Sequence, residues 1–133
     1  MSRLGLILSH DENDHPFVTT FAYEQGLRPL YEQIGCTLVE VAARGSIAGL
    51  PVMLIVDEEG LYKEHPYRNR AANDLAATLT GNAAYALNLP LVGHAVLLYD
   101  TGEDWRGFTS DELAPLIAQL EHDGFDCIVP KVA

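Results

Sequence analysis

The sequence predicts a single α+β domain, residues 1–133, whose mixed or mainly antiparallel sheet is covered by helices on one face. Short apolar runs at Leu4–Ser9 and Val52–Val56 have the length of buried strands. Along the chain the signals run strand, helix, strand, strand, short strand, helix, strand, helix, and this order favours the α+β class. A length of 133 residues suits one domain with a substantial core.

The first third of the chain is expected to hold a strand, a polar loop and a short helix. The strand at Leu4–Ser9 runs into HDENDHP, residues 10–16, which has the composition of a loop. Pro29 suits the first turn of a helix, because its missing N–H leaves no intrahelical bond unmade there. Apolar residues then share one helical face, and Gly35 supplies the end of the helix.

Two strands and a hairpin are expected next. Residues 36–43 alternate, so that Glu40 faces water while the valines on either side of it face the core. Gly45 and Gly49 bracket a turn region before the apolar run that ends at Val56. A hairpin over Val56–Tyr62 then turns on Asp-Glu-Glu-Gly, whose glycine supplies a positive φ.

A second helix and another buried strand follow. Asn69 is a strong N-cap residue, because its side-chain oxygen accepts a bond from a free backbone N–H. The helix after it carries an apolar stripe and is expected to end at Gly81. Leu91–Tyr99 is apolar enough for a buried strand, and a turn at Asp100 closes it.

The last part of the chain is expected to form an amphipathic helix and a final strand or docked tail. Thr109 to Glu112 has the pattern of a capping box. Pro115 fits a helix only in its first turn, so Asp111 is an alternative cap. Residues 125–129 are the expected final strand or tail.

The charge of the chain limits its partners. Nineteen acidic residues against eight basic ones give a formal charge of −11, which repels nucleic-acid phosphates and anionic lipid. The N-terminus has no signal-peptide pattern, and polar residues interrupt the apolar stretch 83–99. We therefore expect a cytoplasmic protein without direct nucleic-acid or membrane binding. Cys36 and Cys127 are then expected to be reduced thiols.

Catalytic and metal signals are weak, so we predict no catalytic residue, no cofactor and no metal site. Nucleophile-elbow, phosphate-loop and metalloprotease motifs are absent from the sequence. Cys36 begins an apolar strand, which favours a structural thiol over a nucleophile. A solvated acidic loop is preferred over a metal site made by four residues of the first loop, namely His10, Asp11, Asp14 and His15.

The best candidate binding site lies around the start of the second helix. Arg68 and Arg70 flank Asn69 on an otherwise acidic chain. A helix N-terminus with guanidinium groups can form an anion pocket, and we add Asp57 and His94 to this candidate ligand site. The alternative is that both arginines are exposed and pair with Asp57, Glu58 or Asp74.

Three segments together resemble a known family. They are GCTLVEVA (35–42), IVDEEGLYKEHPYRNRAA (55–72) and LVGHAVLL (91–98), in this order. The resemblance is to the phage- and plasmid-associated domain-of-unknown-function family 3846 and covers about residues 28–99. It implies a small intracellular protein of a mobile element or its host, and it implies no activity. The positions that match the family pattern are Asp57, Gly60, Asn69 and Gly93.

Three functional hypotheses follow from these patterns. The first is a non-enzymatic binding or regulatory protein that holds a small anionic ligand or a host protein. The second is a DNA mimic that inhibits a host defence enzyme, which requires rows of carboxylates along one face. The third is a small hydrolase that uses Asp57, Glu58 or His94.

Overall fold

The computed structural model describes residues 3–10, 16–36, 38–58 and 68–128. Their elements follow one another in the order β1, β2, α1, β3, β4, α2, α3, β5, β6, α4, β7. The strands are β1 Leu4–His10, β2 Pro16–Ala22, β3 Val39–Ile47, β4 Leu50–Asp57, β5 Ala95–Asp100, β6 Trp105–Arg106 and β7 Asp126–Ile128. The helices are α1 Arg28–Ile34, α2 Arg70–Thr80, α3 Ala84–Asn88 and α4 Ser110–His122.

The strands form one mostly antiparallel sheet, which confirms the predicted α+β class. Its strand order is β3-β4-β5-β1-β2-β7, and β6 pairs with the end of β5. The β2–β7 pair is parallel, and every other pair is antiparallel in the described part of the chain. The interior strands β4 and β5 correspond to apolar runs of the sequence, because each has a neighbouring strand on both edges and side chains packed on both faces.

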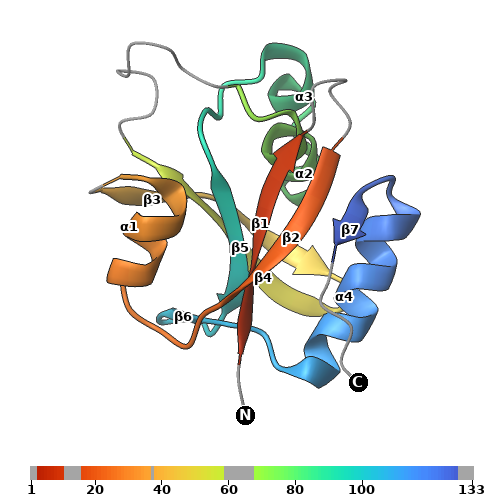
Figure 1. Ribbon diagram of the computed structural model, residues 1–133. Coiled ribbons are helices and arrows are strands. Elements are labelled where there is room, and N and C mark those ends of the chain that lie inside the picture. Colours follow the sequence, from red (N-terminus) through yellow and green to blue (C-terminus); the bar gives the residue numbers. More distant parts are fainter. Residues whose placement is uncertain (1–2, 11–15, 37, 59–67, 129–133) are drawn as a thin grey trace.

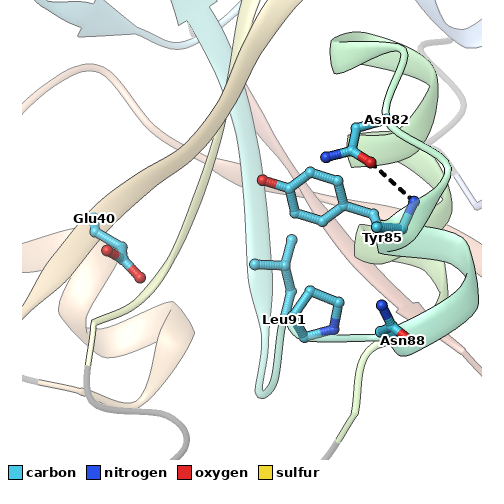
Figure 2. A pocket seen from close by; sticks show the side chains of 7 residues that line it. Glu40, Asn82, Tyr85, Asn88 and Leu91 are labelled. Carbon is cyan, nitrogen blue, oxygen red and sulfur yellow. Dashed lines mark hydrogen bonds between the residues drawn. The ribbon is translucent and has the colours of Figure 1, made fainter.

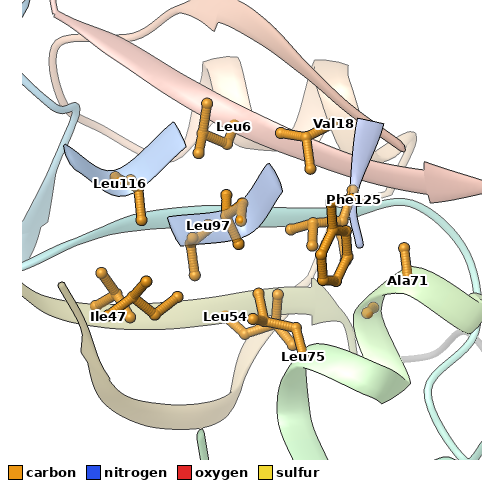
Figure 3. Packing of buried hydrophobic residues seen from close by; sticks show 14 of the residues in the cluster. Leu6, Val18, Ile47, Leu54, Ala71, Leu75, Leu97, Leu116 and Phe125 are labelled. Carbon is orange, nitrogen blue, oxygen red and sulfur yellow. The ribbon is translucent and has the colours of Figure 1, made fainter. Parts of the chain in front are cut away.

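Helices cover both faces of the sheet, whereas the sequence predicted helices on one face only. α2 and α4 share one face, and α1 covers the other. Figure 3 shows the larger core, in which Leu75 of α2 and Leu116 of α4 pack on Leu54 and Leu97 of the sheet. On the other face, Leu30 and Ile34 of α1 pack with a second set of buried residues: Phe21, Tyr23, Met53, Ile55, Val96 and Leu98. Figure 1 shows α1 and α4 on opposite sides of the strands.

A two-residue turn joins β3 and β4. Ala48 and Gly49 both have positive φ, 52° and 78°, which is the type I′ geometry that matches the twist of a hairpin. Gly45, expected beside the turn, lies instead within β3. A Cβ there would meet the side chain and carbonyl of Leu79 at 3.0 Å, so the glycine lets α2 close onto the edge of the sheet.

Capping residues fix the predicted helices. Asn69 caps α2 and Gly81 ends it in the left-handed conformation, as predicted. At α4 the cap is Thr109, not Asp111, and Glu112 completes the capping box. Pro115 therefore lies beyond the first turn, contrary to expectation. It is exposed, and the Asp111 carbonyl that loses its helical partner is on the exposed side of α4, where water can bond it.

Several of the strands and loops predicted from the sequence agree only partly with the structure. The strand β2 was not anticipated, whereas β7 is the expected final strand. The observed β5 begins at Ala95, four residues later than expected. The turn and partner strand of the Val56–Tyr62 hairpin lie mostly outside the described residues, as do Asp11, Asp14 and His15 of the first loop. No described helix is long and apolar enough to cross a bilayer.

An ion pair joins the short strand β6 to α4. The guanidinium of Arg106 donates to both carboxylate oxygens of Glu112, at 2.8 and 2.9 Å, and lies 3.8 Å from the centre of the Tyr99 ring. Glu112 also accepts from the backbone N–H of Thr109. The Arg106 hydrogen bond, opposed by burial, lowers the pKa of Glu112 from 4.5 to about 2.

We expect Glu112→Gln to lower the free energy of unfolding at pH 7 by about 2–3 kcal/mol. The folded carboxyl has the lower pKa, so its contribution is present above pH 4.5 and is lost as the pH falls towards 2. Urea unfolding at pH 7 and at pH 3 measures both effects. The difference from wild type should shrink at pH 3, and Asp111→Asn, which changes an exposed carboxylate one residue earlier, should cost at most about 0.5 kcal/mol at either pH.

Candidate functional site

The predicted ligand residue Asn69 is buried, and its side chain forms hydrogen bonds within the protein. Its amide nitrogen donates to the carbonyls of Leu8 and Gly93, both at 2.9 Å, and its oxygen accepts from the N–H of Ala72. The residue has no exposed surface. Both amide hydrogens are thus used within the protein, and we assign Asn69 a structural role in place of a ligand contact.

A second buried asparagine, which the sequence did not single out, lies one turn further along α2. Asn73 donates to the carbonyl of Leu91 at 2.9 Å and accepts from the N–H of Leu91 at 3.0 Å. It also donates to the carbonyl of Asn69. The side chain of Asn73 therefore pairs with the Leu91 backbone as a neighbouring strand would, although Leu91 lies outside the sheet.

The two arginines of the candidate anion pocket have partners within the chain. Arg68 is exposed, and its Nη1 donates to the carbonyl of Leu89 at 3.0 Å. Leu89 ends α3 in the left-handed conformation with φ 48°, an unfavourable geometry for leucine that this bond helps to hold. Arg70 lies 4.0 Å from Asp74, one helical turn away. The predicted alternative, pairing with Asp74, therefore holds for Arg70.

The two remaining candidate ligand residues, Asp57 and His94, are next to the paired strand residues Val56 and Ala95, but they do not line a common cavity. Asp57 ends β4 and is 6% exposed. With Glu58 it lines a hollow of about 50 Å³, which holds only a few water molecules. His94 lies in the stretch expected to form a buried strand, but it precedes β5, is exposed and does not line this hollow. The described geometry therefore gives a substrate no place between these groups.

A larger cavity adjoins this hollow. We call it the β3–α3 groove, because it opens between Glu40 of β3 and the helix α3. Its volume is about 400 Å³, within the usual range of ligand sites. Figure 2 shows Glu40 on one side of the groove and Asn82, Tyr85 and Asn88 on the other, with Leu91 between them. The lining residues are Glu40, Asn82, Ala84, Tyr85, Asn88, Pro90 and Leu91.

The walls of the groove differ in charge and polarity. Glu40 is exposed, as predicted, and its carboxylate makes no hydrogen bond or ion pair with another described residue. Across the groove, Tyr85 places its hydroxyl 3.5 Å from the carbonyl of Ala42, a long bond that anchors the ring beside β3. Asn88 adds an exposed amide. The groove thus combines a free negative charge, an aromatic ring and amide groups over an apolar floor.

The hollow beside Asp57 extends the negative side of this groove. Both cavities share Glu40, Pro90 and Leu91 in their linings. Asp57 and Glu58 therefore lie in the same hollow as Glu40. Asp57 also interacts with another group of the chain. This clustering raises the local negative potential, which favours a positively charged occupant.

Neither cysteine is placed for catalysis. Neither Cys36 nor Cys127 forms a disulfide. Both are partly buried, and they pack on opposite faces of the sheet. Burial, with added repulsion from Glu121 and Asp126, raises the pKa of Cys127 to about 11, so its thiol stays protonated at neutral pH. Among the described residues, no group of three or more His, Cys, Asp or Glu is arranged to hold a metal ion.

The acidic residues that the structure describes come from several separate elements. Val56 pairs with Ala95, so Asp57 and Glu58 lie near the start of β5, whereas Glu103 and Asp104 follow its end. Asp111 and Glu121 lie at opposite ends of α4. DNA mimicry, which requires a row of carboxylates along one face, stays a prediction from the sequence.

The groove could not be found from sequence motifs, because its residues come from separate elements. Its one sequence signal is the set of polar and proline interruptions in the apolar stretch 83–99, among them Asn88 and Pro90. In the structure these interruptions coincide with α3 and with the connection that follows it. Asn88 and Pro90, which interrupt the apolar stretch, both line the groove.

We expect Asn73→Ala to lower the free energy of unfolding by about 2–3 kcal/mol, because it leaves the N–H of Leu91 without its partner and removes one of the two hydrogen bonds to the Leu91 carbonyl. Urea unfolding measures this loss. Hydrogen exchange should be faster at the Leu91 amide than in wild type.

The matched control is Asn88→Ala, the same change at an exposed groove residue, which should cost no more than about 0.5 kcal/mol. Equal stabilities of the two variants would contradict the structural role of Asn73.

Comparison of the chain with known protein families, with curated proteins and with solved structures returns no match. The resemblance to family 3846 therefore stays a prediction from the sequence. Any functional inference rests on the geometry of the β3–α3 groove and on the charge of the chain.

Proposed function

We propose that this protein is a binding module without catalytic chemistry, and that its ligand places a positively charged group in the β3–α3 groove. The observation that carries the proposal is the exposed Glu40 carboxylate, which has no partner among the described residues and lines a groove of about 400 Å³. A regulatory role, a cytoplasmic location and a mobile-element origin remain predictions from the sequence.

Several features of the groove support a cationic ligand. An ammonium or guanidinium group beside Glu40 gains a charge-assisted hydrogen bond. The ring of Tyr85 can attract the same cation, and the amide of Asn88 can orient polar groups attached to it. The formal charge of −11 attracts cations from a distance and raises the rate of encounter.

The cationic ligand replaces the anionic ligand that the sequence favoured. The N-cap of α2 is buried and occupied by its own side chain, Arg68 bonds Leu89, and Arg70 pairs with Asp74. An anion would therefore have to displace internal bonds at this helix start. At Glu40, by contrast, a cation fills a place that the described chain leaves empty.

We expect N-acetyl-lysine methylamide, a lysine side chain with capped ends, to shift ¹H–¹⁵N signals of Tyr85, Asn88 and Leu91 in a titration. Glu40→Gln should weaken this binding about fivefold, because it removes the charge but keeps the shape. Added salt should weaken binding to wild type as it screens the attraction.

Two controls make the titration specific. N-acetyl-norleucine methylamide, which lacks the charge, should cause little change at the same signals. Glu103→Gln alters the net charge equally at the far end of β5 and should change the affinity less than about twofold. Equal weakening by Glu40→Gln and Glu103→Gln would show unspecific attraction and refute the groove as the site.

A further inference from the structure

An apolar side chain that packs in neither core cluster lies on α3, the helix that forms one wall of the groove. Leu87 of α3 is 80% exposed, compared with 45% for Leu27 and 47% for Leu38, the other exposed large apolar residues in the part of the chain that the structure describes. It belongs to neither core cluster, whereas Tyr85 and Leu91 pack against the larger one. An exposed leucine beside a cavity is a common feature of surfaces that contact another molecule.

The helical positions place Leu87 at the side of the groove and not behind it. Ala84, Tyr85 and Asn88 all line the groove. Successive residues of a helix are about 100° apart, so Leu87 lies about 60° around the helix from Ala84, on the side away from Tyr85. A ligand that leaves the groove past Ala84 would therefore meet Leu87 next.

We propose that the occupant of the groove is an extended segment of a partner protein, which places a Lys or Arg side chain beside Glu40 and an apolar side chain on Leu87. This inference rests on the proposed binding of a cation. A free amine of small size can satisfy Glu40 but cannot also cover Leu87. A peptide chain carries both kinds of side chain on one strand.

Charge complementarity identifies the partner segment as basic. Glu40, Asp57 and Glu58 line the joined cavities, and the whole chain has a formal charge of −11. A basic segment is steered towards such a surface, while an acidic one is repelled. Contact with Leu87 then supplies apolar burial, which salt does not screen.

Two capped hexapeptides test the proposal: acetyl-(Leu-Lys)₃-amide and acetyl-(Ser-Lys)₃-amide, which have equal length and charge. Isothermal titration calorimetry should show that wild type binds the Leu peptide about tenfold more tightly than the Ser peptide. Leu87→Ala should abolish this preference and leave the titration with capped lysine unchanged. Glu40→Gln should weaken the binding of both peptides.

Leu27→Ala is the matched control, because it truncates an exposed leucine beside α1, which covers the other face of the sheet. It should keep the tenfold preference. Circular dichroism and thermal melting establish that each variant is folded, and truncation of an exposed side chain should leave both unchanged.

The outcomes separate this inference from the proposed function. If capped lysine binds through Glu40 but wild type binds both peptides equally, or if the preference survives Leu87→Ala, the peptide partner is refuted and the cation site stands. If Glu40→Gln affects no probe, both proposals fail. Self-association of wild type that Leu87→Ala abolishes would assign Leu87 to a contact between two copies and overturn the partner segment.

Discussion

The fold depends on a pair of buried asparagine side chains at the start of α2. Asn69 and Asn73 lie one turn apart, and their amide groups bond the backbone of Leu8, Leu91 and Gly93. Those backbone groups belong to β1, near its end, and to the connection between α3 and β5. Buried backbone groups need partners, so the two amides make it possible for three segments to meet inside the protein.

The same amide pair determines the shape of the β3–α3 groove. Asn73 fixes Leu91, which forms the floor, and Arg68 fixes the carbonyl of Leu89, where α3 ends. The five-residue helix α3 has its first N–H bonded by the side chain of Asn82, but a helix this short could not persist alone, so it depends on these contacts for its position. A groove whose floor is held by buried hydrogen bonds is formed before a ligand arrives, which reduces the ordering that binding requires.

The sequence predicted correctly those helix ends that depend on hydrogen bonds between residues close in the chain. The caps Asn69 and Thr109 and the terminator Gly81 act through bonds within a few residues, so the sequence reveals them. Asn73 was missed because a polar residue in a helix usually faces water, and only tertiary contacts make this one buried. The groove brings Glu40 of β3 against α3, more than forty residues later in the chain, so no sequence pattern records their approach.

The arginines of this acidic chain have partners close in sequence, and this supports a binding role for the unpaired Glu40. Arg28, Arg70 and Arg106 pair with Glu32, Asp74 and Glu112, all within six residues of one another in sequence. Arg68 bonds a backbone carbonyl instead. These four arginines thus serve local structure, and none of them is left to neutralise the groove. A carboxylate on solvent-exposed β3 loses little by remaining hydrated, and it gains a strong hydrogen bond when a cation enters. The surplus of acids attracts cations to the surface in general, while the ring of Tyr85, the apolar floor and Leu87 give the groove features that a uniformly charged surface lacks.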